Sequence, residues 1–153
     1  MEQILEYRQR LLARYETAAC EFREAVATAT SSTHPRKADG WSIHQIAVHT
    51  RDVEKMVYGL RFRRTLEEDN PLFENFDGDV WMDEHYQADE PMEIILDELV
   101  DSVQEAVTRL RGVALEAWTR PSRHATYGGG FTVQTWVERA LAHIEEHLKS
   151  VVT

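Results

Sequence analysis

Two histidines, His143 and His147, lie four residues apart in the segment AHIEEH of residues 142–147. In a helix, residues at positions i and i+4 lie one turn apart, with about 5–6 Å between their β-carbons. Both imidazoles can therefore reach one metal ion at about 2.0–2.1 Å. Such a pair also arises by chance, so its position relative to the apolar residues decides its meaning.

Both histidines continue an apolar stripe with helical spacing, formed by Trp136, Ala140, His143, His147 and Val151. A third histidine continues a second stripe, formed by Ile46, His49, Val53, Met56 and Leu60. A polar side chain that points into a core needs a partner there. The sequence thus directs three histidines towards one interior.

The three histidines also match in height. His49 lies seven residues past Ser42, a helix cap, and so about 10 Å from that end. His143 and His147 lie a similar distance from the far end of the last helix, so the three rings meet at one level if the two helices run antiparallel. This pattern predicts a divalent metal site on three histidines; core histidines bonded to carboxylates or carbonyls are the alternative.

Other readings of these residues are weaker. Residues 143–147 match the H-x-x-E-H signature of a zinc protease, but such an enzyme needs a third ligand well downstream and only six residues follow His147. His34 lies in a Ser/Thr-rich segment and His44 points off the inner stripe. Residues of the connections are candidates to line the substrate approach: Trp81, His85, His124 and Tyr127.

Three carboxylates are candidates to orient the imidazoles by accepting the second ring N–H: Asp52, Glu145 and Glu146. A solvated helix face is the alternative for all three. Three neutral imidazoles leave a fourth coordination position open, as in catalytic metal sites. An open position can activate a water for hydrolysis or hold a thiol as thiolate for thiol transfer. Imidazole suits zinc, nickel, iron and copper alike, so the metal is not specified.

Four segments with helical periodicity must position these residues: about 3–28, 42–66, 91–112 and 132 to the C-terminus. Ser42 and Gln45 form a capping box, and Pro91 and Gly112 are start and end signals. Residues 128–130, three glycines, are interpreted as a flexible turn before the cap Thr132. Residues 67–90 form a long connection with at most one short helix. A long connection makes the second and third helices parallel, which leaves the fourth antiparallel to both.

The composition restricts the function classes. The chain has 153 residues, 42% of them apolar, which predicts one all-α domain over residues 1–153 without a membrane span. A net charge of −10 disfavours nucleic acid, and we interpret Arg61, Arg63 and Arg64 as a helix-end cluster. A patch with Arg120 and Arg123 could receive a small carboxylate. Without a signal-peptide pattern and with Cys20 as the only cysteine, an inert core thiol, we expect a cytoplasmic protein.

The order of these residues resembles a known family. Trp41-Ser42, Gln45, His49, Asp52 and Glu54 look like the W-[ST]-x-x-[EQ]…H-x-x-D-x-E signature of the DinB-like (YfiT-like) metalloenzymes. Gly130 and Thr132, followed by His143 and His147, resemble the closing motif of that family. The resemblance spans nearly the whole chain.

The resemblance implies a four-helix bundle of up-down-down-up topology, a long crossover between helices two and three, and a metal on the three histidines. It also implies a homodimer, for which large aromatics offer a weak physical hint: Trp41, Phe62, Phe73, Phe76 and Trp81. Members of the family include S-transferases and isomerases that use a low-molecular-weight thiol. We therefore expect a metal-dependent transferase or hydrolase acting on a small molecule; a non-catalytic metal-holding or stress-response module is the alternative.

Overall fold

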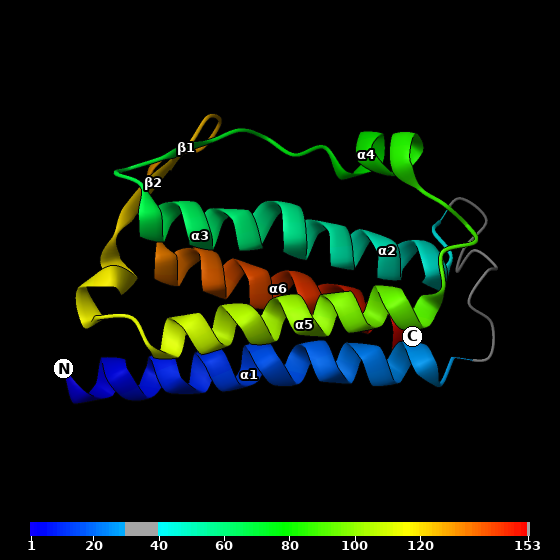
Figure 1. Ribbon diagram of the computed structural model, residues 1–153, viewed down its shortest axis with the longest axis horizontal. Coiled ribbons are helices and arrows are strands. Elements are labelled where there is room, and N and C mark those ends of the chain that lie inside the picture. Colours follow the sequence, from blue (N-terminus) through cyan, green and yellow to red (C-terminus); the bar gives the residue numbers. More distant parts are fainter. Residues whose placement is uncertain (30–39, 153) are drawn as a thin grey trace.

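Four long helical segments lie side by side in the computed structural model, which describes residues 1–29 and 40–152 (Figure 1). Three of the segments are the helices α1 (Glu2–Ala27), α5 (Met92–Arg111) and α6 (Val133–Val152). The fourth is one continuous rod made of α2 (Ile43–Val53), the π-helix η1 (Glu54–Tyr58) and α3 (Gly59–Glu67). Short elements complete the described chain: β1 (Leu72–Phe73), α4 (Gly78–His85), the 3₁₀-helix η2 (Leu115–Thr119), β2 (Pro121–His124) and β3 (Gly128–Thr132).

The helix directions follow an up-down-down-up order. In Figure 1, α1 and α6 run one way along the bundle, and the α2–α3 rod and α5 run the other. The all-α bundle and its long crossover after α3 are therefore confirmed. Helix α1 packs against α5 and α6, and α2 packs against the same two helices. Helices α2 and α6 are thus antiparallel neighbours, as the convergence of three histidines requires.

Helix α2 begins at a complete capping box. The Gln45 N–H donates to the Ser42 hydroxyl at 3.1 Å, and the Ser42 N–H donates to the Gln45 side-chain oxygen at 2.8 Å. His44, in the first turn, is bonded on both ring nitrogens: Nδ1 to the Tyr86 hydroxyl at 2.6 Å and Nε2 to the Glu90 carbonyl at 2.8 Å. These bonds fix where α2 starts and join it to the end of the crossover.

The π-helix η1 changes which side chains of the rod face the core. The Gly59 N–H bonds to the Glu54 carbonyl, five residues earlier, so one turn holds an additional residue. The regular stripe predicted for this helix is wrong at Met56, whose side chain is 38% exposed. Glu54, Val57 and Phe62 are buried instead. The wide turn rotates everything after Val53 relative to a regular α-helix.

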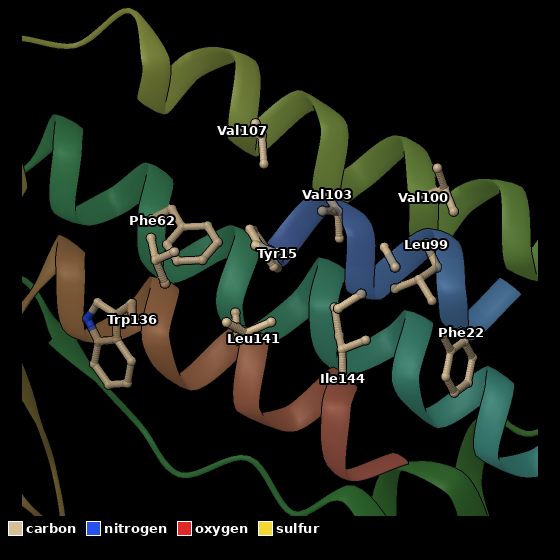
Figure 2. Packing of buried hydrophobic residues seen from close by; sticks show 14 of the residues in the cluster. Tyr15, Phe22, Phe62, Leu99, Val100, Val103, Val107, Trp136, Leu141 and Ile144 are labelled. Atoms are coloured by element: carbon tan, nitrogen blue, oxygen red, sulfur yellow. The ribbon is translucent and has the colours of Figure 1, made fainter. Parts of the chain in front are cut away.

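The core between the four segments is densely apolar. Figure 2 shows side chains from all four meeting there, among them Tyr15, Phe22, Phe62, Leu99, Trp136 and Ile144. Phe62 and Phe73, predicted among the aromatics that hint at a dimer interface, are only 3% and 2% exposed. Two of the five aromatics behind that hint are therefore core residues of this chain.

A small sheet lies at the N-terminal end of α6. Strand β2 pairs parallel to β1 and antiparallel to β3. The flexible turn predicted for residues 128–130 is wrong, because these glycines form most of β3, with positive φ at Gly128 and Gly130. The sheet is tied to α6 because the Trp136 indole N–H donates to the Ser122 hydroxyl at 2.8 Å.

Some expectations concern residues outside the described parts. His34 and most of the Ser/Thr-rich segment after α1 are among them. Within residues 1–29 and 40–152, none of the helices combines the length and the apolar character that crossing a membrane requires.

Candidate metal centre

Three imidazoles meet between α2 and α6. The Nε2 atom of His143 lies 3.2 Å from Nε2 of His49 and 3.1 Å from Nε2 of His147. The nitrogens that the three rings can offer to an ion all lie within 4.8 Å of one another. The structure thus brings together the three histidines that the sequence pattern singles out.

Local structure explains this convergence. His49 lies two turns into α2, and the capping box at Ser42 fixes that level. His143 and His147 are one turn apart near the C-terminal end of α6. Figure 1 shows that α2 begins at the end of the bundle where α6 finishes. The antiparallel pair therefore places the three rings at a common height.

Burial keeps the cluster neutral. Removal from water, with a smaller contribution from the nearby His147, lowers the pKa of His49 to about 4 and that of His143 to about 3. The pKa of His147 is also lowered by burial, while Glu146 acts in the opposite direction. Neutral imidazole is the form that binds a metal ion, so the three rings are ready as ligands at neutral pH.

The spacing of the three nitrogens fits one divalent ion. Ligands at about 2.0–2.1 Å around a tetrahedral ion lie about 3.3 Å from one another, close to the Nε2–Nε2 distances observed. Without an ion, Nε2 of His143 can donate to at most one of its two neighbours. The Nδ1 atom of His143 is buried and has no hydrogen-bond partner among the described residues. A cation between the rings would satisfy the three facing lone pairs together.

Comparison with known proteins identifies the family of this chain. The model of the DinB superfamily matches residues 3–151. The chain belongs to the DinB superfamily. A search of curated proteins finds no match.

A solved structure shares the fold. Its description reads: "YfiT from Bacillus subtilis is a probable metal-dependent hydrolase with an unusual four-helix bundle topology". It aligns with a TM-score of 0.84 and 20% sequence identity over 96% of this chain and 85% of the other. At this identity the likeness establishes the fold. The up-down-down-up bundle is therefore an architecture that this DinB-superfamily chain shares with YfiT.

The crossover of this DinB-superfamily protein packs directly on one of the three histidines. A β-carbon added at Gly78, the first residue of α4, would lie 2.9 Å from Cε1 and 3.3 Å from Nδ1 of His49. The Trp41 ring also packs against His49, with ring centroids 4.8 Å apart. Sequence reasoning missed Gly78, because a single glycine in a connection carries no periodic signal. The close approach of α4 to the imidazole depends on that glycine.

Replacement of Gly78 by alanine should weaken metal binding without unfolding the protein. Alanine favours helix over glycine by about 1 kcal/mol, so α4 itself should gain stability. The new methyl group must nevertheless displace either the His49 ring or α4, because real β-carbons do not approach other atoms to 2.9 Å. We expect zinc affinity to fall about tenfold or more, as for other changes around a ligand.

The matched control is Gly112→Ala, at the C-terminal end of α5, where the added β-carbon would meet its nearest atom at an ordinary 3.7 Å. A competition titration with a chromophoric chelator measures the affinity of both variants. Equal affinity in Gly78→Ala and Gly112→Ala would show that the contact with His49 does not restrain the ligand.

Two of the three candidate carboxylates, Asp52 and Glu145, have partners other than the imidazoles. Asp52 accepts from Nε of Arg51 at 2.9 Å and from the indole N–H of Trp81 at 3.1 Å. Glu145 pairs with Arg14 at 2.8 Å, and Glu146 is exposed. Asp52 and Trp81 thereby link α2 to α4, so this carboxylate holds the crossover over the site.

The remaining candidates for substrate contact lie in two places. On α4, His85 stacks on Trp81 with ring centroids 3.6 Å apart. On the sheet, the buried His124 accepts the N–H groups of Thr126 and Tyr127 on Nδ1, so its Nε2 carries the proton. The Tyr127 side chain is 69% exposed.

Tyr58, the last residue of the π-helix, contacts the histidine cluster and was missed from the sequence. Its ring centroid lies 5.8 Å from that of His143. Burial raises the pKa of its hydroxyl, while the positive charges of Arg61 and Arg139 act in the opposite direction. A regular helix gives no reason to expect position 58 beside His143, since the additional residue in η1 determines where it points.

Proposed function

We propose that this protein is a metal-dependent enzyme that binds one divalent ion, zinc, nickel or iron, on His49, His143 and His147. The observation that carries the proposal is the convergence of three neutral imidazoles: Nε2 of His143 lies 3.2 Å and 3.1 Å from Nε2 of the other two rings, and the ligand nitrogens all lie within 4.8 Å of one another. An ion bound there would supply Lewis acidity and lower the pKa of a water or thiol at its open position. Neutral donors favour this chemistry because they offset none of the ion's charge.

The residues around the centre support a reaction on a small molecule. The contact of Gly78 with His49 and the Trp81–Asp52 hydrogen bond hold α4 over one side of the site, which restricts the access of water. The Tyr58 ring lies against His143, with ring centroids 5.8 Å apart. The ligand rings are therefore held between fixed neighbours, as a precise catalytic geometry requires.

Hydrolysis and thiol transfer both fit such a centre. Hydrolysis is supported by the description of YfiT, whose fold this chain shares. Thiol transfer is supported by the histidine-only donor set, which leaves the ion's positive charge to stabilise a thiolate. A metal-holding module without turnover is a third outcome, and the experiment below separates the three.

A cobalt-substituted sample should identify the nucleophile. After elemental analysis of freshly purified protein, the native ion is exchanged for cobalt, and bacillithiol, mycothiol, glutathione and cysteine are added in turn at millimolar concentration. A new sulfur-to-cobalt charge-transfer band with any of them supports thiol transfer. An unchanged spectrum with all four excludes transfer of these thiols and leaves hydrolysis, to be screened with ester and amide substrates.

The matched control for both measurements is His147→Ala, which removes one ligand. It should lose the charge-transfer band or the hydrolytic activity together with the metal. Metal-loaded protein that shows neither sulfur binding nor turnover of any screened ester or amide would contradict the enzyme proposal and favour a metal-holding module.

A further inference from the structure

We propose that Arg61 and Arg139 form a subsite for an anionic group, the carboxylate of a small substrate, next to the three-histidine centre. The assignment of the anion to a substrate rests on the proposed function. The subsite itself rests on the contacts of the two guanidinium groups and can be tested without metal.

Among the residues that the structure describes, no carboxylate pairs with the buried cation Arg61. The residue is 8% exposed, and its guanidinium lies over the rings of Trp136 at 4.6 Å and Phe73 at 5.6 Å. One nitrogen donates to the backbone carbonyl of Glu74 at 3.2 Å. In the described part of the chain no carboxylate lies within 4.0 Å of it, although arginine is almost never buried unpaired. Most of its five N–H donors are left for a ligand.

Arg139 brings a second cation to the same aromatic cluster. Its guanidinium lies 5.1 Å from the centroid of Phe131, whose ring stacks on Trp136 at 4.8 Å. Burial lowers the pKa of Arg61, and the charge of Arg139 lowers it further, so the two cations act on each other. Arg139 is exposed and, within residues 1–29 and 40–152, forms no ion pair. It is therefore able to move towards an incoming anion, whereas Arg61 is fixed.

The two arginines lie near residues that contact the histidines. Arg139 precedes His143 by one helical turn, about 6 Å, and Trp136 precedes it by two turns, about 10 Å. Tyr58 connects the two regions, because its ring contacts His143 and both cations act on the pKa of its hydroxyl. A substrate that spans them must therefore carry its anionic group away from its reacting group, at the spacing between the guanidinium groups and the imidazoles.

The carboxylates in this region do not neutralise the two arginines. Glu74 and Glu146 are close enough to shift the pKa values of His124 and Tyr58, yet both are exposed and neither lies within 4.0 Å of Arg61 or Arg139. A small anion from solution can therefore compete for the guanidinium donors.

The patch expected around Arg120 and Arg123 is engaged in holding the fold. Arg120 donates to the carbonyls of Thr65 at 2.8 Å and Glu68 at 2.7 Å. Arg123 donates to the carbonyl of Asn70 at 3.1 Å. These backbone contacts leave fewer free donors there than Arg61 and Arg139 have.

The chemistry of the subsite favours a carboxylate. A planar guanidinium matches a carboxylate through two parallel N–H···O bonds, and aromatic rings beside it can cover an apolar tail. The net charge of −10 repels polyanions, so the anion must be small enough to respond to the local charge alone.

The first experiment uses metal-free protein with ¹⁵N-labelled arginine side chains. Butyrate is titrated and the Nε–H resonances are followed by NMR, with butyramide as the neutral analogue and inorganic phosphate as the competing anion. We expect saturable shifts at Arg61 and Arg139 with butyrate, none with butyramide, and weaker binding of phosphate. Affinity for butyrate should fall about tenfold in Arg139→Gln, as for the loss of a charge-assisted hydrogen-bond pair.

The matched control is Arg10→Gln, which removes the same charge from an exposed position on α1 and should bind butyrate like the unmodified protein. Arg61→Lys, which keeps the charge but not the planar donor set, should also weaken binding. Absence of saturable butyrate binding, equal affinity in Arg139→Gln, or tighter binding of phosphate than of butyrate would each overturn the proposal.

A second experiment links the subsite to the metal centre. Zinc-loaded protein is titrated by calorimetry with ω-mercapto carboxylic acids of increasing length and with the ω-mercapto alcohols of the same length. The acid whose thiol and carboxylate reach the zinc and the arginines at the same time should bind more tightly than the alcohol of the same length. Arg139→Gln should remove this difference in affinity and leave the affinity for the alcohol unchanged. Equal binding of acid and alcohol at every length would mean that the two sites do not share a substrate.

The two experiments separate failure of the subsite from failure of the proposed function. If the protein binds no metal, the butyrate titration still reports on the arginines. If butyrate fails to bind while the mercapto alcohols bind to the zinc, the result supports the metal centre and contradicts the anion subsite.

Discussion

Replacing His49, His143 or His147 singly by alanine is expected to remove most of the bound divalent metal from the purified protein. The three rings act as one chelate, since their Nε2 atoms face a common point from two helices. Changes in groups that only support a ligand lower affinity about 10–100-fold, so the loss of a ligand should cost 100-fold or more. Elemental analysis measures the occupancy, and a zinc competition titration measures the affinity.

The control for this prediction is His85→Ala. His85 is also an imidazole near the site, but it is exposed and stacked on Trp81 on α4. Its removal should leave occupancy near that of the unmodified protein. Full metal content in His49→Ala would mean that His143 and His147 hold the ion with a different third group. Reduced metal content in His85→Ala would indicate that His85, on α4, takes part in metal binding.

The histidine cluster could be predicted from sequence because its signals are local. The i, i+4 spacing and the apolar stripes of α2 and α6 follow from the helical period, and the capping box fixes the start of α2. The parallel α2 and α5 could be inferred from the length of the crossover between them. None of these steps requires knowledge of a contact between distant residues.

The π-helix could not be predicted, and it determines much of the surroundings of the site. Its one additional residue has no pattern of its own, so a regular helix placed Met56 in the core. The same residue brings Tyr58 to His143. Helical periodicity alone therefore predicts the wrong orientation for side chains that follow Val53 on this rod, such as Met56.

Contacts between residues far apart in the sequence could not be predicted either. Arg61 was interpreted as part of a helix-end cluster, but its guanidinium packs on Trp136, which is far away in the sequence. The approach of Gly78 to His49 depends on where the crossover lies. The strand β3 rests on pairing with β2, since its glycines carry no alternating apolar pattern. Only tertiary structure decides these three features.

A buried carboxyl group in the π-helix should make stability depend strongly on pH. Glu54 is 0% exposed, and among the described residues neither oxygen of its side chain has a hydrogen-bond partner. Burial raises the pKa of this carboxyl to about 8. Glu54 is therefore protonated in the folded protein at neutral pH, and the chain takes up a proton from the solvent when it folds.

The sign of the effect follows from linkage. The folded-state pKa of about 8 lies above the ordinary value of 4.5, so between these pH values the folded protein holds a proton that the unfolded chain has released. The contribution of Glu54 to stability is therefore fully present below about pH 4.5 and is lost as pH rises towards 8. The loss is about 1.4 kcal/mol per pH unit, or about 3–5 kcal/mol over the whole range.

Glu54→Gln removes this titration while keeping the shape of the side chain. The variant and the unmodified protein should be about equally stable near pH 4.5, and the variant should become more stable by several kcal/mol at pH 8. Urea denaturation of metal-free protein at a series of pH values measures the difference. Glu105→Gln, at an exposed position of α5, should change stability little at any pH. A difference between Glu54→Gln and the unmodified protein that stays constant with pH would show that folding does not raise the pKa of Glu54, because the difference grows with pH only where the folded-state pKa lies above the unfolded-state value.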